Sequence, residues 1–133
     1  GEELRKDLKN KLNELLNKSF CYSAVVEKGD QRGRGIGYPT INQKYPENLV
    51  KLKNGVYKSK VIFKNREYEA ITNIGIRPTF KSDYIISETY IKNFSGDLYG
   101  KDITVVPCEF LRGEIKFNSL DELKKQIEED IKK

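Results

Sequence analysis

The sequence predicts an all-β core, an antiparallel barrel or sandwich, with one helix near each end of the chain. Short runs rich in β-branched and aromatic residues fill the region from about residue 20 to residue 111, and clusters of Gly, Pro, Asn and Asp separate them. Helical spacing of Leu and Ile occurs only at the two ends. Strands do not alternate with helices, which argues against a parallel sheet. A length of 133 residues fits one domain.

The N-terminal segment, residues 2–18, is predicted to be a helix. Its leucines recur at spacings of three and four, so that they form one apolar stripe: Leu4, Leu8, Leu12, Leu15 and Leu16. Such a helix either caps the domain or connects it to an upstream domain. We therefore divide the chain into residues 1–19, an N-terminal helix or interdomain connector, and residues 20–133, the domain itself.

Five stretches are predicted strands by composition: residues 20–27, 55–63, 66–74, 84–93 and 103–111. The second alternates, with Tyr57, Ser59, Val61 and Phe63 predicted on one face and Lys58 and Lys60 on the other. The second and third form a hairpin through a tight turn at Lys64-Asn65. Pro107 lacks a backbone N–H, so the last strand is expected to lie at an edge or to contain a bulge. Residues 45–53 and 75–83 are expected to be surface connections because they contain Gly, Pro and polar residues.

The chain is expected to finish with a helix that begins at about Leu120. Ser119 and Glu122 have the spacing of a capping box, in which the serine side chain accepts from a backbone N–H of the first turn. The apolar stripe of this helix consists of Leu120, Leu123, Ile127 and Ile131.

Composition excludes several classes of site. The chain has no His, which removes the usual acid–base residue and any Ser-His-Asp triad. Cys21 and Cys108 are too few for a disulfide framework or a zinc site, and we expect both to be buried free thiols in a cytoplasmic protein. A net charge of +5 is mild and fits an anionic small molecule at least as well as nucleic acid. No run approaches the roughly 18 apolar residues of a membrane helix.

Residues 29–42 are the stretch most indicative of function. Glycines allow backbone N–H groups to approach an anion, and arginines add charge-assisted hydrogen bonds to phosphate oxygens. Thr40 and Asn42 come directly after the glycines and arginines of this stretch. In an extended segment their neutral oxygens share one face, which suits Mg²⁺ beside phosphates. This predicts a nucleoside triphosphate site. The alternative is a solvent-exposed loop, because the glycine spacing matches neither the dinucleotide fingerprint nor the Walker loop.

Five motifs in register resemble the riboflavin kinase family and cover most of the chain from Gly29 onward. They are Gly29-Asp30-x-x-Gly33-Arg34-x-x-Gly37-Tyr38-Pro39-Thr40-x-Asn42, Asn54-Gly55-Val56-Tyr57, Thr72-Asn73-Ile74-Gly75-Ile76-Arg77-Pro78-Thr79-Phe80, Glu88 with Asp97-Leu98-Tyr99-Gly100, and Leu111-Arg112-x-Glu114-x-Lys116-Phe117. The chain departs from the usual family pattern at three positions and by one extra residue between Val26 and Gly29. The three are Tyr38 for Phe, Ile41 for Ala, and Tyr90 for a His common in bacterial members.

The resemblance implies a six-stranded antiparallel Greek-key barrel with a C-terminal helix. It also implies transfer of the ATP γ-phosphoryl group to the 5′-hydroxyl of riboflavin, giving FMN. Bacterial members closest to this pattern form the C-terminal half of a bifunctional FAD synthetase, whose N-terminal FMN adenylyltransferase domain is absent from this sequence. Riboflavin and ATP are therefore the expected partners, with neither nucleic acid nor membrane.

Carried over onto this sequence, the resemblance implies roles for individual residues. Glu88 would orient or deprotonate the ribityl hydroxyl, and Thr40 and Asn42 would bind Mg²⁺. The segment that binds nucleotide phosphates would comprise Gly29, Gly33, Arg34, Gly35, Gly37, Tyr38, Pro39 and Thr40. Tyr99, Arg112 and Phe117 are the flavin-binding candidates. For Arg112 an ion pair with Glu114 is an equal alternative, and the two aromatic residues could instead belong to the core.

Two other function classes stay open at this point. Small barrels with basic loops can bind single-stranded nucleic acid through stacked aromatic residues. The arginines here collect beside Gly and Pro, which favours a pocket. A flavin-binding module without catalysis is the second class, and the presence of Thr40, Asn42 and Glu88 argues against it.

Overall fold

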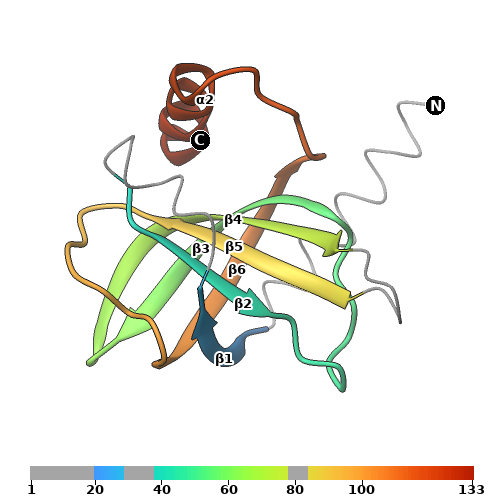
Figure 1. Ribbon diagram of the computed structural model, residues 1–133, viewed down its shortest axis with the longest axis vertical. Coiled ribbons are helices and arrows are strands. Elements are labelled where there is room, and N and C mark those ends of the chain that lie inside the picture. The colour runs from blue at the N-terminus through green and yellow to red at the C-terminus, as the bar shows by residue number, and fades with distance from the viewer. Residues whose placement is uncertain (1–19, 29–37, 78–83) are drawn as a thin grey trace.

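The structure, a computed structural model, describes residues 20–28, 38–77 and 84–133 (Figure 1). Six antiparallel strands close into a barrel in the order β1-β2-β5-β4-β3-β6, and one helix, α2, follows them. The elements are β1 Tyr22–Glu27, β2 Thr40–Lys44, β3 Gly55–Phe63, β4 Arg66–Arg77, β5 Tyr84–Ile91, β6 Asp102–Arg112 and α2 Leu120–Lys132. The helix predicted for residues 2–18 lies outside the described residues.

The topology is a Greek key. Strands β3, β4 and β5 are consecutive neighbours, and β6 returns to lie beside β3. Strand β2 pairs with β5, and β1 then closes the barrel between β2 and β6. The six-stranded antiparallel barrel implied by the family resemblance is confirmed, and so is the C-terminal helix.

Alternate residues of each strand point into the barrel, as the pleat requires. In β3, Tyr57, Ser59 and Val61 are buried, whereas Lys60 is exposed, which confirms the predicted alternation. The apolar core inside the barrel consists of Tyr22, Val26, Ile41, Tyr45, Leu52, Tyr57, Val61, Ala70, Ile74, Ile91, Leu98, Ile103, Val105 and Phe110.

Helix α2 covers part of the outer surface of the barrel (Figure 1). A second apolar cluster joins them, made of Val56, Ile71, Tyr90, Leu123, Ile127 and Ile131, with Tyr38, Leu111 and Phe117 packed against it. The predicted capping box is present, since the Glu122 N–H donates to Ser119 Oγ at 3.2 Å. The Glu122 carboxylate accepts a hydrogen bond from the Asn118 N–H at 3.0 Å, so two backbone N–H groups at the start of α2 have side-chain acceptors.

The predicted hairpin is confirmed, but its second strand is longer than predicted. Gly75, Ile76 and Arg77 were expected in a loop, and they continue β4 because they pair with β5 from Ile86 to Tyr84. In β6 the register shifts so that Cys108 is an extra residue between Pro107 and Glu109, which confirms the bulge. The expectation that residues 45–53 form a surface connection is partly wrong, because Tyr45 and Leu52 are buried in the core.

Both cysteines are free, as predicted, but their predicted burial is wrong. Cys21, directly before β1, is exposed, and Cys108 is half-buried at the bulge. Burial raises the pKa of the Cys108 thiol above its ordinary value. No helix in the described part of the chain has the length and apolar composition needed to cross a membrane.

Candidate active site

A row of three polar residues crosses the outer face of the barrel beside α2. Glu88 of β5 lies directly opposite Asn42 of β2 on one side and directly opposite Asn73 of β4 on the other. Residues directly opposite in antiparallel strands have β-carbons about 4.5–5.5 Å apart. The sheet register therefore places one carboxamide on each side of the Glu88 carboxylate.

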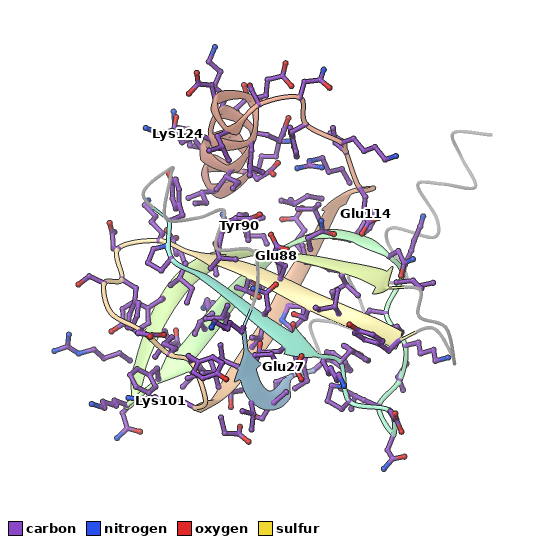
Figure 2. All side chains as sticks on the ribbon, in the orientation of Figure 1. Glu27, Glu88, Tyr90, Lys101, Glu114 and Lys124 are labelled. Carbon is purple, nitrogen blue, oxygen red and sulfur yellow. The ribbon has the colours of Figure 1, made fainter. Side chains whose placement is uncertain are left out.

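Tyr90 holds the carboxylate of Glu88 from the neighbouring position on the same face. Its phenol donates a hydrogen bond to Glu88 Oε1. The tyrosine ring packs in the cluster beneath α2, so the helix supports the donor (Figure 2). Tyr90 had been noted only as a departure from the family pattern, and the structure makes it the residue that orients Glu88.

Thr40 and Asn42 lie on the same outer face of β2, two residues apart, as predicted for a metal-binding pair. Asn42 is 4% exposed, and Thr40 is half-buried. The Thr40 hydroxyl donates only a long hydrogen bond, 3.3 Å, to the Tyr38 carbonyl. Among the described residues no group of three His, Cys, Asp or Glu could hold a metal ion. A metal here would have neutral protein oxygens, with its other ligands from water or phosphate, which suits Mg²⁺.

Asn73 carries a buried acceptor without a donor. Its Oδ1 is inaccessible and has no hydrogen-bond partner in the described structure. Leaving a buried polar group unpaired costs about 1–3 kcal/mol, so such groups in native proteins call for an explanation. Asn73 was quoted as part of a motif but was given no role. Only the strand register, which brings it opposite Glu88, indicates one.

Tyr38 and Pro39, just before β2, fix the end of the predicted phosphate-binding segment beside the candidate site. The carbonyl of Pro39 accepts from the Ile91 N–H at 2.9 Å, which fixes the start of β2 against β5. Tyr38 packs against the cluster under α2, and burial, together with the charge of Glu128, raises its pKa. The remaining predicted residues of this segment lie outside the described residues: Gly29, Gly33, Arg34, Gly35 and Gly37.

Arg112 at the end of β6 anchors α2. Its guanidinium donates to Asp130 through Nη2 at 2.9 Å and Nε at 3.4 Å, and Asp130 is fully buried. Gln126 also donates to Asp130, at 3.1 Å. The ion pair of Arg112 thus joins β6 to α2, instead of the local pair with Glu114 that was the alternative at the sequence level.

The three predicted flavin contacts are not brought together. Tyr99 precedes β6 and is 60% exposed, whereas Arg112 is the last residue of that strand. Phe117 is half-buried against the cluster beneath α2, the helix to which Arg112 is bonded through Asp130. In Figure 2, Lys101, two residues after Tyr99, lies on the side of the barrel away from α2. Contact of each residue with flavin stays a prediction.

The closed six-stranded barrel and the helix that follows it define a small antiparallel β-barrel domain. A family model described as riboflavin kinase, or flavokinase, matches residues 16–133. The chain belongs to the riboflavin kinase family.

Named relatives agree with this assignment. The chain is 42% identical over 120 residues to the trifunctional protein RibF/MnmA of Mycoplasmoides gallisepticum, covering 90% of this chain and 18% of the relative. It is 36% identical to the bifunctional riboflavin kinase/FMN adenylyltransferase of Listeria monocytogenes, covering 89% of this chain and 38% of that protein. The chain therefore spans less than half the length of these relatives.

A solved structure shares the fold. The crystal structure titled as a macrolide-efflux protein from Streptococcus pneumoniae superposes with a TM-score of 0.77 and 31% sequence identity. The match covers 86% of this chain and 38% of that one. The similarity again falls within a larger protein.

Proposed function

We propose that this domain transfers the γ-phosphoryl group of ATP to the 5′-hydroxyl of riboflavin, forming FMN and ADP. The observation that supports the proposal is the cross-strand pair of Asn42 and Glu88, in which a carboxamide lies directly opposite a carboxylate. Phosphoryl transfer needs mainly positioning and neutralisation of charge; Glu88 would supply the positioning, and Asn42 would hold the metal that neutralises charge. Membership of the riboflavin kinase family supports the choice of substrates.

Thr40 and Asn42 would hold Mg²⁺ in this proposal. Their oxygens are neutral, lie on one face and are two residues apart on a strand, which fits an ion that keeps water and phosphate oxygens as its other ligands. When bound, the metal neutralises charge on the transferring phosphate. The predicted phosphate-binding segment ends at Thr40, so nucleotide phosphates would reach the same point.

Glu88 would orient the hydroxyl that is phosphorylated. Tyr90 donates to Oε1, which leaves Oε2 to accept from the 5′-hydroxyl of riboflavin. A bond forms between that hydroxyl oxygen and the γ-phosphorus, the bond from γ-phosphorus to the oxygen of ADP breaks, and the hydroxyl proton passes to Glu88 and then to solvent. Because the transition state is loose, the orientation that Glu88 imposes matters more than early proton removal.

The test of this function is the product formed by the purified chain with riboflavin, ATP and Mg²⁺. We expect a product with the mass of FMN, together with one equivalent of ADP, and no FMN when Mg²⁺ is removed with a chelator. A preparation that is folded by circular dichroism and yields no FMN would overturn the proposal. A salt-dependent oligonucleotide complex without ATP turnover would favour the nucleic-acid alternative.

We further propose that the chain is the kinase module of a longer cytoplasmic protein that also carries an FMN adenylyltransferase, with residues 1–19 as the connector. The support is the bifunctional name of relatives that this chain covers only in part. Removing residues 1–19 should leave FMN formation per folded molecule within a few-fold, since no motif residue lies there. Loss of activity in a truncated chain that still folds would contradict the connector role.

A further inference from the structure

Asn73 continues the row formed by Asn42 and Glu88, and the proposed chemistry does not use it. It lies directly opposite Glu88, on the face of β4 that also carries Ile71 of the cluster beneath α2. The inward-facing neighbours Thr72 and Ile74 are fully buried in the barrel, so Asn73 faces outward with Glu88. Its Oδ1 is nevertheless inaccessible and unpaired in the described structure.

We propose that Asn73 binds the ribityl chain of the acceptor, with Oδ1 accepting a hydrogen bond from the hydroxyl adjacent to the one that is phosphorylated. The inference rests on the proposed riboflavin kinase function. It adds a second contact to the polyol and a reason for an unpaired acceptor at this point. Because Oδ1 has no accessible surface in this structure, the Asn73 carboxamide would turn when the acceptor binds, and the hydrogen bond gained would remove the cost of the unpaired group.

The order of the strands decides which ligand Asn73 meets. Neighbouring strands lie about 4.8 Å apart, so the backbones of Asn42 and Asn73 are about 10 Å apart, with Glu88 of β5 between them. The proposed metal pair, Thr40 and Asn42, is on β2, and the predicted phosphate-binding segment leads into that strand. We therefore assign the metal and the phosphates to the β2 side of Glu88, and the acceptor chain to the β4 side.

The spacing of the two acceptors suits a polyol. Glu88 and Asn73 are directly opposite, so their β-carbons are about 5 Å apart and both side chains rise from the same face. Hydroxyls on adjacent carbons can then donate to one acceptor each. Beyond Asn73 on the same face, the Glu114 carboxylate lies against Gly75, where an added β-carbon would be 2.1 Å from Oε1. The row continues with another acceptor, as a chain of several hydroxyl donors requires.

The experiment measures riboflavin binding by quenching of flavin fluorescence. Asn73→Leu keeps the size of the side chain and removes the acceptor. We expect riboflavin affinity to fall about 10–100-fold, the usual effect of losing a partner for a hydrogen bond in a buried site. The KM for ATP should change by less than about twofold. Asn48→Leu is the matched control, because Asn48 is exposed in the connection between β2 and β3, and it should bind like the unaltered chain.

A riboflavin analogue lacking the 4′-hydroxyl makes the test independent of how the variant folds. The unaltered chain should bind this 4′-deoxy analogue about 10–100-fold more weakly than riboflavin, and Asn73→Leu should bind both equally. Unchanged riboflavin affinity in Asn73→Leu, or equal binding of both flavins by the unaltered chain, overturns the role of Asn73. If the unaltered chain binds riboflavin but Asn73→Leu weakens both flavins alike, the residue is structural and the inference also fails. Absence of riboflavin binding or FMN formation in the unaltered chain instead overturns the proposed function itself.

Discussion

The inner and outer faces of β4 and β5 differ in how their polar residues are hydrogen-bonded. On the inner face, Thr72 of β4 links Ser59 of β3 to Thr89 of β5, with oxygens 2.6 Å and 3.0 Å apart. On the outer face of β4 and β5, one residue along, Asn73 and Glu88 lie opposite each other, and Asn73 keeps an acceptor without a donor. The three inner hydroxyls hydrogen-bond to one another, whereas the outer row keeps an acceptor that a ligand could use.

Under the proposed function, one short strand serves stability with one face and catalysis with the other. Successive side chains point to opposite faces, so neighbouring residues in β5 belong to different environments. Thr89 is completely buried in the barrel, whereas Glu88 is half-buried beside α2. Substitutions on the outer face should therefore reduce activity with little effect on stability, and substitutions on the inner face should do the reverse.

The largest effect is expected from Glu88→Gln. The amide keeps the size of the side chain but does not accept the hydroxyl proton, so kcat should fall roughly 10²–10⁴-fold, the usual range for a general base. Thermal unfolding and riboflavin binding should stay close to those of the unaltered chain. Steady-state FMN production decides the point, and a near-normal kcat would remove Glu88 from the mechanism.

The metal pair should come next. Thr40→Ala and Asn42→Ala each remove an oxygen proposed to hold Mg²⁺. Losing a residue that only supports a metal ligand costs roughly 10–100-fold in activity, so losing a ligand itself should lower kcat by at least that factor. Raising the Mg²⁺ concentration should restore part of the rate, and riboflavin affinity should change little. Normal turnover at ordinary Mg²⁺ in either variant would show that the pair does not bind the metal.

Thr72→Val tests the inner face. The substitution keeps the shape but removes the hydroxyl that joins Ser59 and Thr89, so the free energy of unfolding should fall by about 1–3 kcal/mol. Thr104→Val is the matched control: it breaks the exposed hydroxyl pair with Ser23, 2.6 Å apart, and should change stability by less than about 0.5 kcal/mol. Denaturant titration gives both values. A loss of kcat per folded Thr72→Val molecule would break the separation between the two faces.

The last effect concerns alkaline pH and the buried tyrosines of the core. Burial raises the pKa of Tyr45 to about 12, and it also raises those of Tyr22 and Tyr57 above the ordinary value of about 10. A raised folded-state pKa stabilises the fold fully below pH 10, and this contribution is lost as pH rises through the folded-state pKa. Unfolding free energy should therefore decline from about pH 10 upward, as measured by denaturant titration at each pH. A flat profile up to pH 12 would contradict the burial of these phenols.

Much of the fold could be predicted because its signals are local. Alternation in residues 55–63 located β3, and the turn at Lys64-Asn65 has the positive φ angles, 51° and 63°, that a tight hairpin turn needs. Ser119 and Glu122 located the start of α2. The extension of β4 through Gly75 was missed, because pairing with β5 overrides the low strand propensity of glycine.

The site was harder to predict because it depends on contacts between strands that are distant in sequence. Thr40, Asn42 and Glu88 could be named from motifs, but the position of Asn73 opposite Glu88 follows only from the register of β4 and β5. The ion pair of Arg112 with Asp130 spans 18 residues and depends on where α2 docks. Tyr90 shows the same limit, since its bond to Glu88 needs both side chains on one face.

The close approach of Glu114 to Gly75 has a consequence for sequence variation within the family. A β-carbon at position 75 would lie 2.1 Å from Glu114 Oε1, so any larger residue there must displace that carboxylate. The displaced atom is at the far end of a flexible side chain, so the fold can tolerate the change while the acidic group moves away. Positions 75 and 114 should therefore co-vary among homologues, with glycine at 75 accompanying a long acidic residue at 114 and a larger residue at 75 accompanying a shorter or neutral one.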